Sequence, residues 1–308
     1  MDAADLKVFE AVARAGGIGR AARELHTVQS NVTARMRRLE EELGTALFER
    51  HSRGVNLTSA GRRLLPYARE SARLLAEARR AVEDGPDPRG TVTLGSLETT
   101  AAFRLTPVLV AYAKECPLVE VSLSTGTTGS LVRDVLEHRL EGAFVAGPIR
   151  HPDLIEEPIV TEELAFLSAR AVTMDALRGA PGGPKILVFR TGCSYRQRLD
   201  ELLSTRGIKS YRLLEFGTLD GILGCVSAGL GITLLPRAVV EGSRYAKDLA
   251  IHELPAAQSR VTTVFIRRRS GFTSRALARF MECAQRLYAR QANVKSRGNG
   301  AVPLLRAR

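Results

Sequence analysis

The stretch AARELHTVQSNVTARMRRLEEELGTALFERHSRGVNLTSAG, residues 21–61, decides the fold of the N-terminal part of the chain. Its apolar residues recur at spacings of three and four, at Val28, Val32, Met36, Leu39 and Leu43. This period predicts a helix, which Gly44 closes. A shorter helix, about residues 18–25, precedes it across the turn His26-Thr27-Val28. Two helices joined by so short a turn are typical of a helix-turn-helix.

A further helix is predicted before this pair. Leu6, Phe9 and Val12 lie on one helical face, and Gly16-Gly17 can end the helix in a left-handed cap. The N-terminal segment is therefore expected to be helical up to Gly44.

The polar face of the third predicted helix is suited to reading DNA. Small hydrogen-bonding side chains and arginine make contacts to base edges in the major groove. For a single helix a solvated face is the more common explanation, but the preceding helix and tight turn favour DNA. The predicted contact residues in this helix are Gln29, Ser30, Asn31, Thr33, Arg35, Arg37 and Arg38.

A basic hairpin is predicted directly after this helix. Two short β-like runs flank the turn Ser52-Arg53-Gly54. Arg50 and Arg53 are predicted to contact phosphates or the minor groove, although the turn alone would be an ordinary surface feature.

One long helix is predicted from the N-cap Thr58 to about Asp84, with Pro66 in its early part. Its apolar and small residues alternate spacings of four and three, as in a coiled-coil seam. We predict that this helix pairs two copies of the chain, the alternative being that it packs on the second domain. The predicted dimerisation residues are Leu64, Ala68, Leu75, Ala78 and Val82. GPDPRG, residues 85–90, then indicates a hinge.

Strands and helices alternate from residue 90 onward, which predicts an α/β domain with parallel strand pairs. A chain of 308 residues with 44% hydrophobic and 25% charged residues is long enough for two ordinary globular domains. No apolar run is long enough to cross a membrane, and no secretory signal is evident at the N-terminus, so we expect a cytoplasmic protein.

The net charge of +12 is concentrated at the C-terminus, since residues 260–308 carry +11 and residues 1–90 only +3. Arg275, Arg279, Arg286 and Arg290 fall on one face of a predicted C-terminal helix, which is most simply a solvated face. Total charge is therefore weak evidence for nucleic-acid binding.

With these motifs in hand, residues 5–65 resemble the DNA-binding domain of LysR-type transcriptional regulators. The segment LTPVLVAYAKECPLVEVSLSTG and the segment SAGLGITLLPRAVV extend the resemblance through most of the chain. It implies an N-terminal all-α winged helix-turn-helix with a long linker helix, followed by a periplasmic-binding-protein-like α/β effector domain of two subdomains. Gly17-Ile18, Asn31 and LEGAFVAG depart from the family's more frequent residues.

The resemblance also implies partners. These are double-stranded promoter DNA, a second copy of the chain through the linker helix, a small anionic ligand and RNA polymerase. The family's usual assembly is a homotetramer built as a dimer of dimers. No cofactor is expected apart from the small-molecule effector, and no metal site.

The expected boundaries follow from the family architecture. Residues 1–58 form the DNA-binding domain, 59–90 the linker helix and hinge, 91–292 the effector domain, and 293–308 a disordered basic tail. Within the effector domain, subdomain I covers about 91–163 and 266–292, and subdomain II covers about 164–265.

An effector site is predicted between the two subdomains, because ligands bind beyond the carboxyl ends of parallel strands. Hydroxyl groups gather there before helices, whose N-termini attract anions. A single hydroxyl is more often a helix cap, but several at one cleft favour a carboxylate-binding site. The predicted effector residues are Ser96, Thr99, Thr100, Thr127, Thr128, Thr191, Cys193 and Thr218.

Two other functions are weighed. Cys193 at a helix start could be a redox-sensing thiol, with Cys225 as the nearest cysteine in sequence. The second domain alone would suit a solute-binding module, against which stand the absent signal peptide and the helix-turn-helix. An enzyme is not expected, because no recognised catalytic motif occurs.

Overall fold

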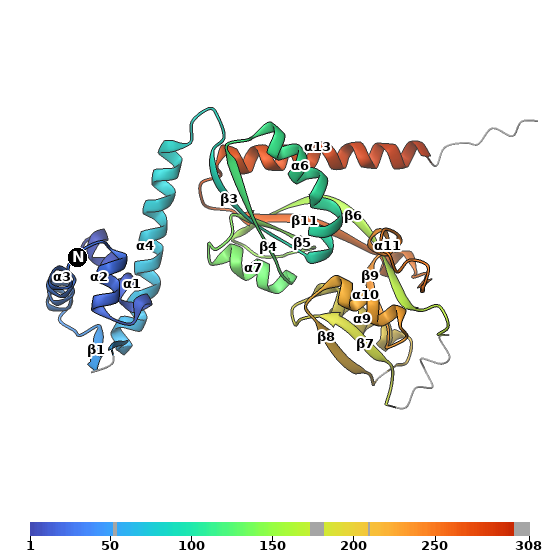
Figure 1. The fold of residues 1–308 in the computed structure, drawn as a ribbon, viewed down its shortest axis with the longest axis horizontal. Helices are drawn as coiled ribbons and strands as arrows, with labels where there is room; N and C mark the ends of the chain where they lie inside the picture. Colours follow the sequence, from blue (N-terminus) through green and yellow to red (C-terminus); the bar gives the residue numbers. More distant parts are fainter. Residues whose placement is uncertain (52–53, 173–181, 209, 299–308) are drawn as a thin grey trace, which may run out of the picture. The chain divides into compact units, whose positions relative to one another are not determined.

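The computed structural model describes residues 1–51, 54–172, 182–208 and 210–298 (Figure 1). The chain divides into two compact units, Met1–Asp84 and Gly85–Arg308, each with its own hydrophobic core. The predicted order of an N-terminal helical unit and an α/β unit is confirmed.

Three helices begin the N-terminal unit as predicted, namely α1 (Ala3–Ala15), α2 (Ile18–Glu24) and α3 (Gln29–Glu42). Asp2 caps α1 by accepting a hydrogen bond from the Asp5 amide, and Gly16 ends it at φ 63°. Val32, Met36 and Leu39 of α3 are buried. The ends of the predicted stripe are wrong, because Val28 is the N-cap of α3 and is 65% exposed, and Leu43 is also exposed.

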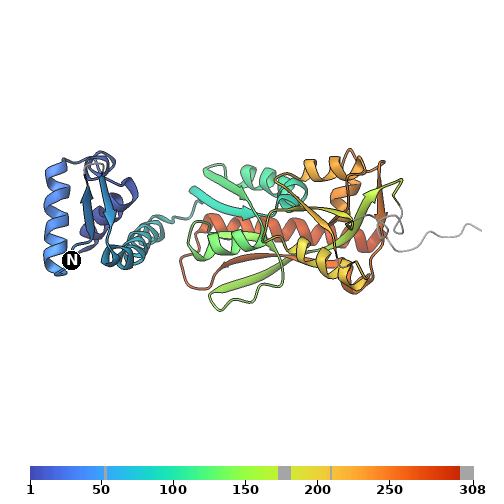
Figure 2. The ribbon, with the colours of Figure 1, turned by 90° about the horizontal axis from the view of Figure 1, so that it is seen from below.

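The predicted hairpin consists of β1 (Phe48–His51) and β2 (Gly54–Leu57), an antiparallel pair visible in Figure 2 as two short arrows. It is held against the helices by hydrogen bonds that backbone amides donate to a carbonyl oxygen and to a carboxylate. The Val55 amide donates to Gly16 O at 3.2 Å, and Glu40 of α3 accepts from the amides of Leu47 and Phe48. Gly54 fits only without a side chain, because a Cβ there would lie 2.5 Å from Gly16 O.

The linker helix is α4 (Ser59–Glu83), capped by the Thr58 hydroxyl as predicted. Its first half belongs to the N-terminal core, where Ala68 is fully buried and Leu64 packs against the core. The prediction that Ala68 contacts a second copy is therefore wrong, since the chain's own core covers it. Farther along, Leu75 and Val82 are 49% and 88% exposed, and Ala78 is exposed as well.

The second unit is built on a seven-stranded sheet with the order β10-β6-β11-β5-β3-β4, in which β9 also pairs with β6. The strands of subdomain I are β3 (Gly90–Ser96), β4 (Val119–Thr125), β5 (Gly142–Ala146), the first half of β6 (Leu154–Ala169) and β11 (Arg260–Arg268). β3 pairs in parallel with β4 and β5, as the alternating pattern predicted.

Helices cover both faces of this sheet. After β3 come α5 (Glu98–Thr100), the π-helical turn η1 (Ala101–Leu105) and α6 (Thr106–Glu115), while α7 (Thr128–Leu136) follows β4. One core joins Phe144 and Phe265 of the sheet to Phe280 of the C-terminal helix, with the first two ring centroids 4.9 Å apart.

Subdomain II uses the second half of β6. Its other strands are β7 (Lys185–Phe189), β8 (Arg212–Phe216), β9 (Thr233–Pro236) and β10 (Leu249–His252). Its helices are α9 (Ser194–Thr205), α10 (Leu219–Ser227), α11 (Arg237–Glu241) and α12 (Ala256–Ser259). β7 and β8 are parallel, and the other strands of this subdomain pair antiparallel with β6.

Strand β6 passes from one subdomain to the other without a break. It pairs with β11 up to Glu163 and with β9 from Leu164, which agrees with the expected crossing near Glu163. The chain returns to subdomain I earlier than expected. The predicted return was near residue 265, whereas β11 pairs with the subdomain I half of β6 from Arg260 onward, where Arg260 lies opposite Glu163.

The C-terminal helix α13 runs from Arg275 to Gly298. It packs its apolar stripe on subdomain I, with Phe280 and Ala284 fully buried. Residues 293–298 are therefore helical rather than disordered, and 299–308 lie outside the described residues. On the opposite face Arg279 pairs with Glu282, and Arg286 pairs with Glu115.

Candidate functional site

On the exposed face of α3, some side chains form hydrogen bonds within the chain and others form none to a described residue. Asn31 donates from Nδ2 to Thr27 Oγ1 at 3.1 Å, and the Thr33 hydroxyl donates to Gln29 O at 2.9 Å. The side chains of Gln29, Ser30 and Arg37 are exposed and make no hydrogen bond to another described residue. These three are the groups on the predicted DNA-contacting face that can turn to an external partner.

Two of the predicted DNA contacts, Arg35 and Arg38, have a structural partner. Both donate to the carboxylate of Asp5, which is 1% exposed, at 3.0 Å and 2.8 Å from its Oδ1. A buried carboxylate needs such partners, because an unpaired charge would be costly to bury. The two arginines therefore attach α3 to α1, a role that the pattern of the sequence did not reveal.

The two predicted arginines of the hairpin are only partly described. Arg53 lies outside the described residues, and of Arg50 the structure describes only the backbone in β1. Their contacts to phosphate stay predictions.

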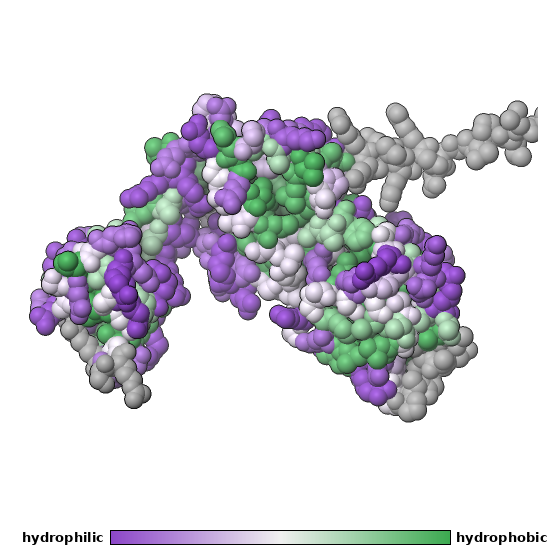
Figure 3. All heavy atoms as spheres, in the orientation of Figure 1, coloured by the Kyte–Doolittle hydropathy of each residue, from purple (hydrophilic) through white to green (hydrophobic). Residues whose placement is uncertain are grey.

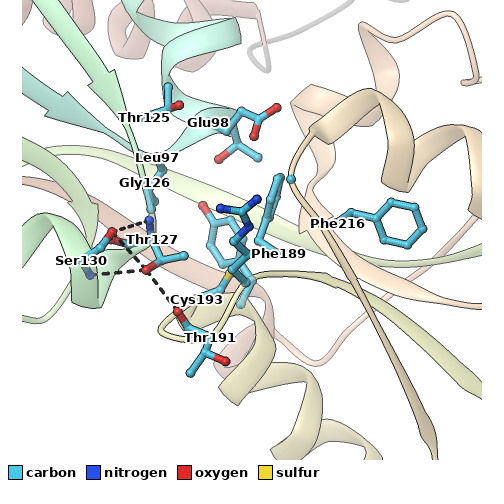
Figure 4. A pocket seen from close by; sticks show the side chains of 14 residues that line it. Leu97, Glu98, Thr125, Gly126, Thr127, Ser130, Phe189, Thr191, Cys193 and Phe216 are labelled. Carbon is cyan, nitrogen blue, oxygen red and sulfur yellow. Dashed lines mark hydrogen bonds between the residues drawn. The ribbon is translucent and has the colours of Figure 1, made fainter.

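A cavity of about 400 Å³ lies between the two subdomains of the second unit (Figure 4). Its walls come from the segments that follow β3, β4, β7 and β8. The lining residues are Leu97, Glu98, Thr99, Thr125, Gly126, Thr127, Ser130, Phe189, Arg190, Thr191, Cys193, Tyr195, Phe216 and Gly217. This volume falls in the usual range for small-molecule sites.

Half of the predicted effector residues line this cavity, namely Thr99, Thr127, Thr191 and Cys193. The other four do not, and each has a structural environment of its own. Ser96 is fully buried and donates to Leu97 O, Thr128 donates to Ser194 Oγ, and Thr218 caps α10. Thr100 is buried with its neighbour Thr99 but does not reach the cavity.

Two hydroxyls in the wall are buried without a partner. Thr99 Oγ1 and Tyr195 Oη make no hydrogen bond of normal geometry to any described residue, and the two side chains are 3% and 4% exposed. Burial raises the pKa of Tyr195 well above its ordinary value, so the phenol keeps its proton, although the nearby Thr99 hydroxyl acts in the opposite direction. Both residues line the cavity, and both oxygen atoms are shielded from solvent.

Two helix N-termini that were predicted to hold an anion are already occupied. The Gly129 amide of α7 donates to Gly192 O at 3.2 Å, and the Leu219 amide of α10 donates to Glu98 Oε1 at 2.7 Å. In both cases the acceptor comes from the opposite subdomain. The start of α9, whose N-cap Cys193 makes no side-chain capping bond, is the remaining helix end at the cavity.

Five further polar residues of the cavity were not predicted from the sequence, namely Glu98, Thr125, Ser130, Arg190 and Tyr195. Arg190 follows directly after β7, so the rule that ligands lie beyond strand ends could have found it. Glu98 and Tyr195 lie in the first turns of α5 and α9, beside the hydroxyls on which the prediction was based, and neither is itself a hydroxyl that typically caps a helix.

Cys193 is 5% exposed, and burial raises the pKa of its thiol despite the opposing influence of the nearby amides of Arg196 and Tyr195. The expected thiolate stabilisation at the helix start is therefore outweighed by desolvation. A reactive redox thiol needs the opposite combination, exposure with a lowered pKa.

Within the described residues, no helix is long and apolar enough to span a membrane. The same residues contain no group of three or more His, Cys, Asp or Glu side chains placed to hold a metal ion.

Two family models match the chain. The model described as "Bacterial regulatory helix-turn-helix protein, lysR family" matches residues 3–62, and "LysR substrate binding domain" matches residues 85–289. The first model covers the helix-turn-helix and hairpin, and the second covers the unit that contains the cavity.

Similar curated proteins are bacterial regulators. YusT of Bacillus subtilis, described as an uncharacterized HTH-type transcriptional regulator, is 45% identical over 282 residues, 92% of this chain and 95% of YusT. The HTH-type regulator SoxR of an Arthrobacter species is 40% identical and covers 92% of this chain and 96% of SoxR.

Two solved structures are similar over nearly the full length. Full-length CbnR complexed with its target DNA aligns with a TM-score of 0.63 at 27% identity, covering 93% of this chain and 99% of CbnR. A full-length OxyR variant from Pseudomonas aeruginosa aligns with a TM-score of 0.64 at 20% identity, over 93% of this chain and 94% of OxyR, which supports the fold alone.

Proposed function

The chain belongs to the LysR family of transcriptional regulators, and on that premise we propose that a small carboxylate bound between its subdomains controls how it engages promoter DNA. It is a DNA-binding transcriptional regulator with a substrate-binding domain. The ligand, its charge and the contact residues belong to the proposal.

The observation that carries the effector proposal is the pair of unpartnered buried hydroxyls, Thr99 Oγ1 and Tyr195 Oη, in the cavity wall. Leaving a polar group buried without a partner costs free energy, so a ligand that accepts from both groups recovers that cost on binding. Arg190 lines the same cavity and makes no ion pair with another described residue, which adds a positive charge for the carboxylate.

The DNA part of the proposal assigns base contacts to Gln29, Ser30 and Arg37, which are the open groups of α3. The similar CbnR structure is a complex with target DNA, and this supports the use of the same unit here. An effector changes regulation only if it binds one arrangement of the subunits more tightly than another.

The redox alternative is not favoured, because Cys193 is buried and its thiol pKa is raised. A solute-binding function alone is also not favoured, because it would not account for the N-terminal helix-turn-helix unit.

A matched pair of variants tests the effector site. Thr99→Val is expected to weaken binding of a carboxylate ligand about 10- to 100-fold, because a hydrogen bond to a charged group is lost. The same change should preserve or slightly raise the stability of the ligand-free protein, since it removes a buried unsatisfied hydroxyl. A thermal-shift screen of small carboxylates, followed by calorimetric titration, measures both effects.

Thr100→Val is the control, because Thr100 is the next residue, is equally buried at 3% exposure and does not line the cavity. If every carboxylate that stabilises the parent stabilises both variants to the same extent, the cavity is not the effector site.

Self-association is proposed through the second half of α4, where Leu75 and Val82 are exposed. A second surface is proposed on the effector unit, where Figure 3 shows apolar side chains gathered over α6 and β4; Val110 and Leu118 are exposed there. Two surfaces are what a dimer of dimers requires.

Leu75→Glu is expected to lower the oligomeric state, because the carboxylate would be desolvated against its copy in the paired helix. Sedimentation velocity should show a species of about half the parent's mass at micromolar concentration. Ala76→Glu adds the same charge next to the seam and should leave the mass unchanged. Equal masses for the parent and the Leu75→Glu protein would contradict the assignment.

A further inference from the structure

A negative charge lies in the wall of the effector cavity. Among the described lining residues, Glu98 and Arg190 are the charged ones, and they have opposite sign. A ligand with only negative charge would be attracted by Arg190 and repelled by Glu98. The balance of charge in the wall therefore suits a ligand that carries both signs.

Glu98 is held in place rather than free to leave the cavity. Its Oε1 accepts from the Leu219 amide at 2.7 Å, so a residue of α5 in subdomain I is fixed to the start of α10 in subdomain II. Oε2 accepts from no described residue. The side chain is half-buried, and its carboxylate has one oxygen committed and one open to a ligand.

The groups that donate to an anion are a separate set. Tyr195 Oη and Thr99 Oγ1 are unpartnered donors, and the start of α9 with Cys193 lies in the same wall. The N-termini of α7 and α10 are filled by Gly192 O and Glu98. An incoming carboxylate is thus directed to Thr99, Tyr195 and Arg190.

The remaining wall is apolar in part. Leu97 and Phe189 line the cavity, whereas Figure 4 shows the Phe216 ring directed away from the other labelled side chains. A cavity of about 400 Å³ holds a molecule of the size of an amino acid with a medium or large side chain.

We propose that the effector is a zwitterionic α-amino acid with an apolar side chain. Its carboxylate accepts from Thr99, Tyr195 and Arg190, and its ammonium group donates to Glu98 Oε2. This inference rests on the proposed effector function and specifies the ligand of the same site.

The test compares each apolar L-amino acid with its deaminated acid and its decarboxylated amine. For phenylalanine these are 3-phenylpropionate and 2-phenylethylamine, and for leucine they are 4-methylpentanoate and 3-methylbutylamine. Thermal shift and calorimetric titration of the full-length protein are expected to show at least one amino acid binding about 10-fold or more tightly than both of its analogues.

Glu98→Gln separates charge from structure, because the glutamine oxygen can still accept from the Leu219 amide. The variant is expected to bind the amino acid about 10- to 100-fold more weakly than the parent does, and to bind the deaminated acid with the same or higher affinity. Glu120→Gln is the matched control, since Glu120 is exposed on β4 and does not line the cavity. It should bind as the parent does.

Three outcomes decide the matter. If deaminated acids bind the parent as tightly as the amino acids, the cavity takes a simple carboxylate, and the zwitterion is refuted while the effector function stands. If Glu98→Gln binds the amino acid as tightly as the parent does, Glu98 does not recognise the ammonium group and the proposal fails. If neither amino acids nor any carboxylate in the wider screen bind, the proposed effector function itself fails.

Discussion

Replacing Ser30 and Arg37 together by alanine is expected to weaken binding to a cognate promoter fragment about 100-fold or more. Both side chains project from α3 without a partner among the described residues, so the folded protein does not need them for stability. A good interaction with a base edge contributes about 1–3 kcal/mol, and the removal of two such interactions gives an effect of this size. Fluorescence anisotropy with a labelled duplex measures the change.

Arg14→Ala controls for the loss of one positive charge. Arg14 is exposed on α1, pairs with Glu10 and Glu24, and lies outside the recognition helix. Its removal should reduce affinity only slightly and equally for all sequences. If the Ser30→Ala, Arg37→Ala protein remains folded by circular dichroism and binds the promoter as tightly as the parent, α3 does not read the bases through these residues.

Glu162→Ala is expected to destabilise the effector unit by about 3–5 kcal/mol, which lowers its melting temperature by about 10 °C. Arg104 of η1 donates from Nε and Nη2 to the two oxygens of Glu162 on β6, both at 2.7 Å. Both side chains are largely buried, and the bond to Glu162 raises the pKa of Arg104. Removal of the carboxylate leaves a buried guanidinium without its partner.

The neighbouring residue provides the control. Glu163 is exposed and lies 3.7 Å from Arg237, so Glu163→Ala should cost less than about 1 kcal/mol. A double variant, Arg104→Met with Glu162→Leu, should recover most of the loss, because it removes both charges. Thermal unfolding followed by circular dichroism suits this chain, which has no Trp. Equal melting temperatures for Glu162→Ala and Glu163→Ala would contradict the predicted contribution of the buried Arg104–Glu162 pair to stability.

The sequence predicts the N-terminal unit well because its signals are local. The spacing of Val32, Met36 and Leu39 predicts α3, and Gly16 and Thr58 mark a helix end and a helix start where the structure has them. A periodic pattern specifies which face is buried inside an element. It does not specify where the buried stripe ends, and Val28 and Leu43, at the two ends of the predicted spacing, are exposed.

Such patterns do not predict contacts between residues that lie far apart in the sequence. Arg35 and Arg38 were predicted as DNA contacts from their place on α3, but both pair with Asp5, which lies 30 and 33 residues earlier in the chain. The same holds for Ala68, whose spacing fits a coiled coil but whose position in space is in the core of its own unit.

The effector cavity was predicted in its general place but only partly in its residues. Hydroxyls before helices indicate strand ends, and this found Thr99, Thr127 and Thr191. Which of two adjacent hydroxyls faces the cavity depends on backbone direction, so Thr100 and Thr128 were predicted for a cavity that they do not line. Glu98 lines the cavity and accepts from the Leu219 amide of the other subdomain, a contact between residues 121 positions apart that no sequence spacing encodes.

The continuity of β6 from Leu154 to Ala169 has a mechanical consequence for the regulator. A joint made of loops rotates through a few soft backbone torsions, whereas a hydrogen-bonded strand resists bending and changes mainly its twist. The subdomains are therefore coupled by a stiff element whose ladder partners change at Glu163 and Leu164. Filling or emptying the cavity is expected to change the twist of β6 and thereby to rotate one subdomain relative to the other by a small angle.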